Sequence, residues 1–280
     1  MRRALPTLLI LLPLLALEAQ DIVVSEAHGS PILITTQGSE PLTEGSAIPP
    51  RARLSLGEES VVLLRRGTRS VELFRRGLYE VSELFNFRPL GRIDFRQLYN
   101  DRIKQFAGQE PELLIGGAAG GGDGPSLEEA ISRLAGGSYD EAERLFREMI
   151  GENEAVSADG AHLLRILAAQ AAYLQDRDAA AYRTLDEVEP EPGHRHYPLY
   201  LLLKAQLLIE SHAFADALET LAEYLGDPAD DEGALQTARL LTGVAYEGLG
   251  NLPVARTYYR RATSPDPTST AAKVARRLLE

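Results

Sequence analysis

The hydrophobic positions of the chain follow two different patterns along its length. Between residues 22 and 85, short apolar runs alternate with turn residues at near-regular intervals. This is typical of strands joined by tight turns. The strand-length runs cover residues 22–24, 32–34, 54–56, 61–64 and 71–74. The pattern predicts a small all-β domain over residues 21–92, and it leaves a sandwich and a barrel equally open.

From residue 126 onward the apolar residues recur at helical spacing, and the predicted helices come in pairs. Four turn segments each lead into a second helix that begins with a small residue: Ala142, Ala181, Ala217 and Ala255, spaced 39, 36 and 38 residues apart. Small residues at such positions let two helices cross closely. The pattern predicts about four helical hairpins over residues 126–280. Ser269 or Thr270 would cap a closing helix at 271–279. A plain helical bundle is the alternative.

Two segments connect these parts. Residues 93–108 place Phe95, Leu98, Tyr99, Ile103 and Phe106 at helical spacing, which predicts an amphipathic helix that packs onto the β-domain. Residues 109–125 include a run of glycines and predict a flexible linker. The predicted fold is therefore α+β in two domains, with strands first and helices after.

The first residues have the features of a secretory signal. Arg2 and Arg3 precede an apolar stretch at 5–17, and cleavage is expected after Ala19. An uncleaved N-terminal anchor is the alternative. The chain has no cysteine, which excludes disulfides, thiolate metal sites and lipid attachment at a cysteine. We expect residues 1–19 to be a signal peptide and the protein to be exported, to the periplasm in a two-membraned bacterium.

Charge is distributed unevenly. Residues 21–115 contain 12 basic and 13 acidic residues, whereas residues 116–280 contain 15 and 27. The acidic C-terminal half argues against binding of nucleic acid, whose phosphates it would repel. Five arginines surround one predicted hairpin: Arg65, Arg66, Arg69, Arg75 and Arg76. They form either an anion-binding edge, for lipid phosphates, wall polymer or the acidic half of this chain, or a solvated edge that discourages strand pairing.

Within residues 21–92 the order of glycines and aliphatic residues resembles that of the periplasmic FecR-type domain. The matching positions are Val24, Gly29, Ile32, Pro41, Leu42, Gly45 and Ile48, followed by a strand at 53–56 and a Gly67 hairpin that leads into 70–73. The resemblance implies a domain outside the inner membrane that engages a signalling partner or the envelope.

The helical part resembles tetratricopeptide (TPR) repeats. Its best-preserved unit has Gly243 and Tyr246 on one helix, a turn at Gly250, and Ala255 and Tyr259 on the next. The family period is 34 residues, so the wider spacing here implies short insertions between units.

The TPR resemblance implies an interaction scaffold whose first helices line a concave, partner-binding face. The implied partner-binding residues are Gln170, Tyr173, Leu202, Gln206, Ile209, Val244 and Glu247. Gln170 and Gln206 occupy equivalent positions, where an amide would bond the backbone of a bound peptide. In the alternative interpretation, the aliphatic side chains bury against neighbouring helices and the two glutamines face solvent.

The sequence offers little that points to chemistry. His194 and His196 lie near Glu189 and Glu191, but no third ligand follows at a metal-binding spacing. Motifs for a serine nucleophile, a zinc protease or a nucleotide loop are absent. We therefore predict a non-enzymatic scaffold without a metal or cofactor, which binds a protein or peptide of unknown identity. The alternative is an envelope protein that binds wall carbohydrate through the β-domain and oligomerises through the repeats.

Overall fold

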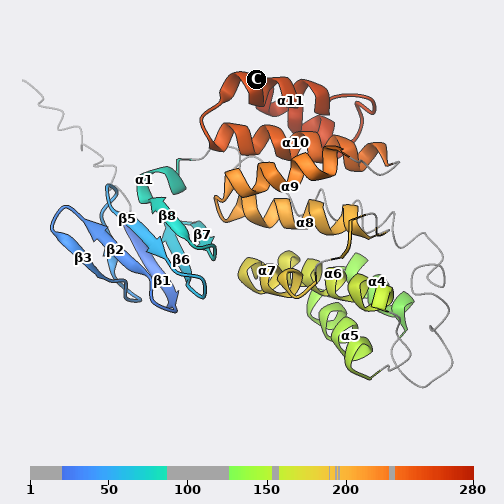
Figure 1. Ribbon diagram of the computed structural model, residues 1–280, viewed down its shortest axis with the longest axis horizontal. Helices are drawn as coiled ribbons and strands as arrows, with labels where there is room; N and C mark the ends of the chain where they lie inside the picture. Colours follow the sequence, from blue (N-terminus) through green and yellow to red (C-terminus); the bar gives the residue numbers. More distant parts are fainter. Residues whose placement is uncertain are drawn as a thin grey trace, which may run out of the picture.

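The computed structural model describes residues 21–86, 126–152, 158–188, 190–192, 194, 196–226 and 231–280. Within these ranges the chain is mixed α+β, with strands at its N-terminal end and helices beyond (Figure 1). This is the coarse class that the hydrophobic pattern predicts. The predicted signal at 1–19, amphipathic helix at 93–108 and linker at 109–125 lie outside the described residues.

The N-terminal part, the β-region, contains two antiparallel sheets of four strands each. One has the order β4-β1-β6-β7 and is built from β1 (Ile22–His28), β4 (Ala47–Ile48), β6 (Val61–Arg66) and β7 (Arg69–Leu73). The other has the order β3-β2-β5-β8 and is built from β2 (Ile32–Thr35), β3 (Gly38–Pro41), β5 (Arg53–Leu56) and β8 (Gly77–Glu80). A short helix, α1 (Val81–Leu84), follows β8.

Alternation along the strands builds the core of the β-region. In β6, Val62 and Leu64 are fully buried, while Leu63 between them is partly exposed. They are paired across the ladder with Leu73 and Val71 of β7, which are also buried. Side chains of successive residues point to opposite faces of a strand, so this register gives one apolar face. Buried residues of both sheets form one hydrophobic cluster.

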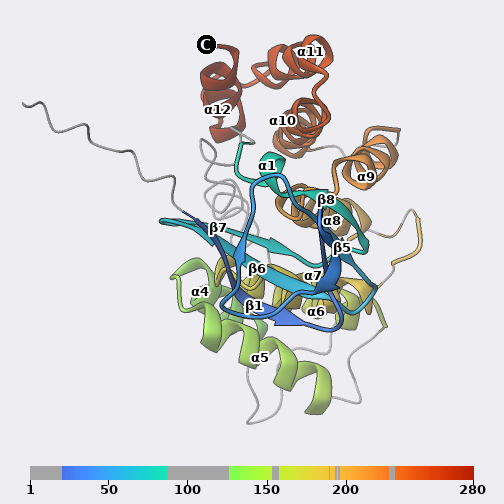
Figure 2. The ribbon, with the colours of Figure 1, turned by 90° about the vertical axis from the view of Figure 1, so that its left-hand side faces the viewer.

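The C-terminal part, the helical region, is a series of helices that pack in adjacent pairs. The helices are α4 (Leu127–Ala135), α5 (Tyr139–Glu152), α6 (Ala158–Leu174), α7 (Asp178–Asp186), α8 (Tyr197–Glu210), α9 (Phe214–Gly226), α10 (Glu232–Gly248), α11 (Leu252–Ala262) and α12 (Thr270–Leu279). In Figure 1 the pairs follow one another from α4 and α5 at the bottom to α10 and α11 at the top. Figure 2 shows α12 beside the last pair.

The four turns within these pairs share one backbone geometry. Each contains a residue with positive φ: Gly137 (86°), Asp176 (61°), His212 (60°) and Gly250 (76°). The amide of the following residue bonds a carbonyl five residues back, at 2.9, 3.1, 2.8 and 2.8 Å. This left-handed closure ends a helix by satisfying one of its free carbonyls. The repeated turn shows that the four pairs are built alike.

Small residues sit where the paired helices cross. The four alanines of the sequence repeat, Ala142, Ala181, Ala217 and Ala255, are all 0% exposed. At Gly243 of α10, an added Cβ would lie 2.5 Å from ring atoms of Tyr259 on α11. The close crossing of α10 and α11 therefore depends on the missing side chain at Gly243.

Candidate functional site

The β-region contacts the helical region along β7, the edge strand of its sheet (Figure 1). The Glu72 side chain of β7 accepts a hydrogen bond from the backbone N–H of Ala179, in the first turn of α7, at 3.0 Å. A carboxylate is favourable there because the first amides of a helix have no partner within the helix. Burial raises the pKa of Glu72 above its usual value, and the backbone N–H donors oppose this rise.

Arg75, which follows β7, joins two helices, α7 and α9, to the β-region. Its Nη1 donates to the Tyr182 hydroxyl on α7 at 2.7 Å, and its Nη2 bonds the Asp216 carboxylate on α9 at 2.9 Å. The guanidinium also lies over the Tyr182 ring, 5.2 Å from its centroid, at a distance where cation–π attraction operates. The Tyr79 hydroxyl donates to the Arg75 carbonyl at 2.8 Å, and burial raises the pKa of Tyr79 to about 12.

An apolar contact completes this junction. The ring of Phe74 packs against that of Tyr182, with centroids 5.1 Å apart, and both residues are 7% exposed. Although Phe74 belongs to the β-region by sequence, it is part of the hydrophobic cluster of the helices. The two regions therefore share apolar contact as well as hydrogen bonds.

A cavity of about 780 Å³, which we call the β–α cleft, opens beside this junction. One wall is a single face of α7, since its residues follow the i, i+3, i+4, i+7 spacing of a helix. The opposite wall comes from the β5–β6 turn and the β7–β8 corner. The lining residues are Glu58, Glu59, Ser60, Val61, Phe74, Arg75, Arg76, Ala179, Tyr182, Arg183 and Asp186.

Charges of both signs surround the β–α cleft. Three arginines and three carboxylates line it, so it presents no field of a single sign. Arg76 already pairs with Glu58 at 2.9 Å, and both side chains are exposed. Such a rim suits a ligand with polar groups of both kinds better than a polyanion.

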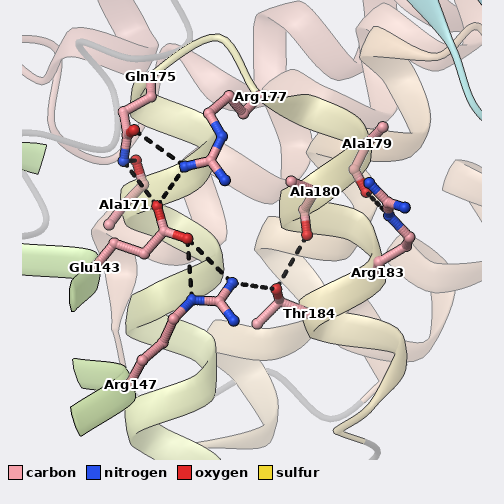
Figure 3. Close-up of polar contacts among 9 residues, drawn as sticks. All are labelled: Glu143, Arg147, Ala171, Gln175, Arg177, Ala179, Ala180, Arg183 and Thr184. Carbon is pink, nitrogen blue, oxygen red and sulfur yellow. Dashed lines mark hydrogen bonds and ion pairs between the residues drawn. The ribbon is translucent and has the colours of Figure 1, made fainter. Parts of the chain in front are cut away.

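A buried carboxylate fixes the helix that forms the cleft wall. Glu143 of α5 is 6% exposed and lies between Arg147 and Arg177 (Figure 3). It accepts hydrogen bonds from Arg177 Nη1 at 2.7 Å, Gln175 Nε2 at 3.0 Å and Arg147 Nε at 3.1 Å. Arg147 also donates to the Thr184 hydroxyl of α7 at 3.3 Å. Because each oxygen of Glu143 is bonded, the group holds α5 against the α6–α7 turn and has a structural role.

The predicted partner-binding residues lie mostly in the core. Gln170 and Tyr173 of α6, Leu202, Gln206 and Ile209 of α8, and Val244 of α10 are each at most 2% exposed. Glu247, the seventh, is partly exposed and accepts a hydrogen bond from Tyr259 at 2.7 Å.

This burial corrects the expectation that these side chains line an open concave face. The reason is that α6 and α8 are apolar around almost their whole circumference, and helices of that kind are buried on all sides. The glutamines are buried as well, not solvent-facing as the alternative supposed. Gln206 donates to the Tyr173 hydroxyl, which in turn donates to Glu210 at 3.2 Å.

The five arginines of the predicted hairpin do not act as one group. Arg75 pairs with an acidic residue of the helical region, as one of the three anion-binding alternatives foresaw. Arg69 donates to the carbonyl of Phe85 at 2.6 Å, within the β-region. Arg65 is exposed on β6 and Arg66 is half-exposed. The hairpin itself is confirmed by the pairing of Arg66 with Arg69.

The fold brings a third histidine to the His194–His196 pair. The rings of His162 and His194 are 5.6 Å apart, and those of His194 and His196 are 5.3 Å apart. His194 Nδ1 accepts the backbone N–H of His196 at 3.2 Å. Within the described ranges, no group of three or more histidine and acidic side chains is arranged to hold a metal ion. Sequence spacing could not reveal the contact with His162, because it arises from tertiary packing.

Two further results bear on classification. Across the described ranges, no helix is both long enough and apolar enough to cross a membrane. A comparison of the chain with models of known protein families and with curated proteins found no match.

Proposed function

We propose that this chain is an exported, non-enzymatic scaffold of the bacterial cell envelope that holds a protein or peptide partner. In this proposal the β-region is a FecR-like domain, and the helical region is an α-solenoid of four TPR-like hairpins. Support comes from the repeated turn geometry of the helix pairs and from the two small antiparallel sheets that precede them.

The observation that carries the proposal is the β–α cleft. Its volume of about 780 Å³ falls within the range of known ligand sites. We place the partner there, rather than among the seven residues predicted from the sequence, because six of those are in the core. The cleft wall on α7 is held by the Glu143 group, so a partner would meet a rigid surface.

The chemistry of the cleft favours a protein segment. Phe74 and Tyr182 line its apolar part, and exposed Arg183 and Asp186 stand at its rim on α7. A peptide offers both apolar side chains and charges of either sign, so it matches such a mixed surface. A small number of placed polar groups around an apolar base is typical of ligand sites.

Photo-crosslinking in cells tests this assignment. A benzoylphenylalanine replacing Asp186 should crosslink one predominant envelope protein, because its side chain lines the cleft. The matched control replaces Glu219, which is exposed on α9 and does not line the cleft. Equal products from both positions, or none from Asp186, would contradict a partner in the cleft.

The wall-binding alternative predicts a different result with the full chain. If the β-region binds wall polymer, the protein should co-sediment with purified peptidoglycan. Replacing the exposed Arg65 and half-exposed Arg66 with glutamine should then reduce sedimentation. Under our proposal neither the wild type nor this variant sediments.

Export is tested separately by joining residues 1–40 to alkaline phosphatase, which is active only after export. Cells should then show phosphatase activity. A variant with glutamate at Arg2 and Arg3 should lose most of it, because the basic residues orient a signal segment.

A further inference from the structure

A second cavity, of about 550 Å³, lies among α9, α10 and α11. We call it the arginine pocket. Its lining residues are Leu225, Leu235, Arg239, Tyr258, Arg261 and Ser264. Unlike the β–α cleft, it has two cations and no carboxylate among these residues.

The two arginines of this pocket lack an ion-pair partner among the residues that the structure describes. Within the described part of the chain, neither the Arg239 nor the Arg261 side chain has an ion-pair or hydrogen-bond partner. Other arginines of the helical region do pair: Arg177 with Glu143 at 2.7 Å and Arg144 with Glu148 at 2.6 Å. In a half of the chain with 27 acidic and 15 basic residues, two cations face a cavity that has no carboxylate among its described lining residues, and these residues carry an excess of positive charge.

Aromatic stacking holds one of the two arginines in place. The Arg261 guanidinium lies over the Tyr258 ring, 5.5 Å from its centroid. That ring stacks on Tyr246 of α10, with centroids 5.7 Å apart and an interplanar angle of 21°. A stacked guanidinium keeps its edge donors available, because stacking uses the face of the group. Arg261 is thus preorganised to receive an acceptor.

The remaining walls are apolar. Leu225 of α9 and Leu235 of α10 are partly buried and pack against the helical core, and Ser264 adds one hydroxyl. A ligand would therefore meet aliphatic carbon beside two guanidinium groups.

We propose that the arginine pocket binds a peptide segment in which a carboxylate side chain lies next to an aliphatic one. A guanidinium matches a carboxylate through two parallel N–H···O bonds. The leucines would cover the neighbouring aliphatic side chain. The pocket does not share any residue with the β–α cleft. A result that contradicts binding at one site therefore leaves the proposal for the other site untouched.

The test uses the full chain and a fluorescein-labelled hexapeptide in which leucine alternates with aspartate. Fluorescence anisotropy gives its affinity, and the Nε–H NMR signals of Arg239 and Arg261 report its position. A hexapeptide with asparagine in place of aspartate is the ligand control. We expect the acidic peptide to bind and shift both arginine signals, and the asparagine peptide to bind at least about tenfold more weakly, since bonds to a charged acceptor are the stronger ones.

Protein variants localise the effect. The double variant Arg239→Gln and Arg261→Gln should weaken binding of the acidic peptide at least about tenfold. The control Arg256→Gln and Arg260→Gln removes two exposed arginines of α11 that do not line the pocket, and it should change affinity less than about twofold. Circular dichroism melts should show that both double variants keep the fold.

Three results would overturn the proposal. The first is equal binding of the aspartate and asparagine peptides. The second is unchanged affinity in the variant that lacks Arg239 and Arg261. The third is displacement of the peptide by an equal concentration of inorganic phosphate, which would indicate a general anion site. Crosslinking from the β–α cleft would remain unaffected by any of them.

Discussion

Replacing Arg75 with methionine should loosen the β-region from the helices. The substitution keeps an unbranched apolar stem, which still covers Tyr182, but removes the guanidinium and its bonds to Tyr182 and Asp216. The control Arg76→Met removes an exposed arginine whose ion-pair partner among the described residues is Glu58, within the β-region. The two variants lose the same charge from adjacent positions.

The expected effect of Arg75→Met can be worked from its contacts. Its ion pair with Asp216 has side chains 34% and 50% exposed, so solvent reduces its contribution to about 0.5 kcal/mol. The hydrogen bond to Tyr182 contributes about 1 kcal/mol, and the cation–π contact contributes about 0.5 kcal/mol at an exposed site. We expect docking to weaken by about 2 kcal/mol, which is roughly a 30-fold change in the docking equilibrium.

Spin labels on the two walls of the cleft would measure this equilibrium. The chain has no native cysteine, so Glu59→Cys and Asp186→Cys give labels only at those positions. Pulsed electron resonance should show one narrow distance in the parent protein and a broad distribution in the undocked state. In a urea titration, Arg75→Met should undock at lower urea than the parent, and Arg76→Met should follow the parent. The reasoning is refuted if the two variants undock together, or if Arg75→Met does not differ from the parent.

Three other tests address separate parts of the structure. Burial lowers the pKa of His212 from 6.5 to about 4. Between these pH values the unfolded chain binds a proton at this histidine and the folded chain does not, so the free energy of unfolding falls as the pH falls. His212→Asn, which tolerates the positive φ at this turn, should reduce that loss by up to about 3 kcal/mol, as urea unfolding at pH 6.5 and pH 4 will show. Gly243→Ala places a methyl group against the Tyr259 ring and should lower the free energy of unfolding by about 1–3 kcal/mol in thermal unfolding. The control Gly151→Ala meets no atom within 4 Å and should stabilise α5 by about 0.5–1 kcal/mol. Equal effects of the two substitutions would disprove the packing argument. Glu143→Ala removes the buried carboxylate that Arg147, Gln175 and Arg177 share as an acceptor, and it should lower the free energy of unfolding by about 3 kcal/mol. A loss below about 1 kcal/mol would show that water replaces the carboxylate.

The helical hairpins could be predicted because their signals are local. A turn and the alanine that follows it are only a few residues apart, so their repeat is visible in the sequence. The closing helix begins as expected, with the Ser269 hydroxyl accepting the Ala272 N–H at 3.1 Å. The four turns were predicted by position, but their shared positive φ was not, since Asp176 and His212 adopt it without glycine.

The five strands that contain an apolar run of three or four residues were predicted, whereas β3, β4 and β8 were missed. β3 consists of four exposed residues, Gly38–Pro41, and contains no aliphatic side chain. β4 has only two residues. These strands exist because a neighbouring strand offers free backbone groups, and hydrophobic alternation does not record that.

Local sequence patterns could not predict the candidate site, because its residues are far apart in the sequence. Glu72 and Ala179 are 107 positions apart, and Arg75 and Asp216 are 141 positions apart. Only the tertiary fold brings such residues together. The burial of Gln170 and Gln206 did have a signal, because α6 and α8 are apolar on nearly all faces. The resemblance to a repeat family led us to assign one face of each first helix to a partner, although the other faces are equally apolar.

The covering of β7 by α7 has a consequence for how the protein is made. An uncovered edge strand pairs readily with another chain, and here the cover arrives late, since Ala179 follows Glu72 by 107 residues. At a synthesis rate of 5–20 residues per second, the edge waits about 5–20 s for its helix. In that interval neighbouring nascent chains on one messenger could pair edge to edge. A chain that is cut short before α7 would keep this edge open permanently, so such fragments should self-associate while the intact protein does not.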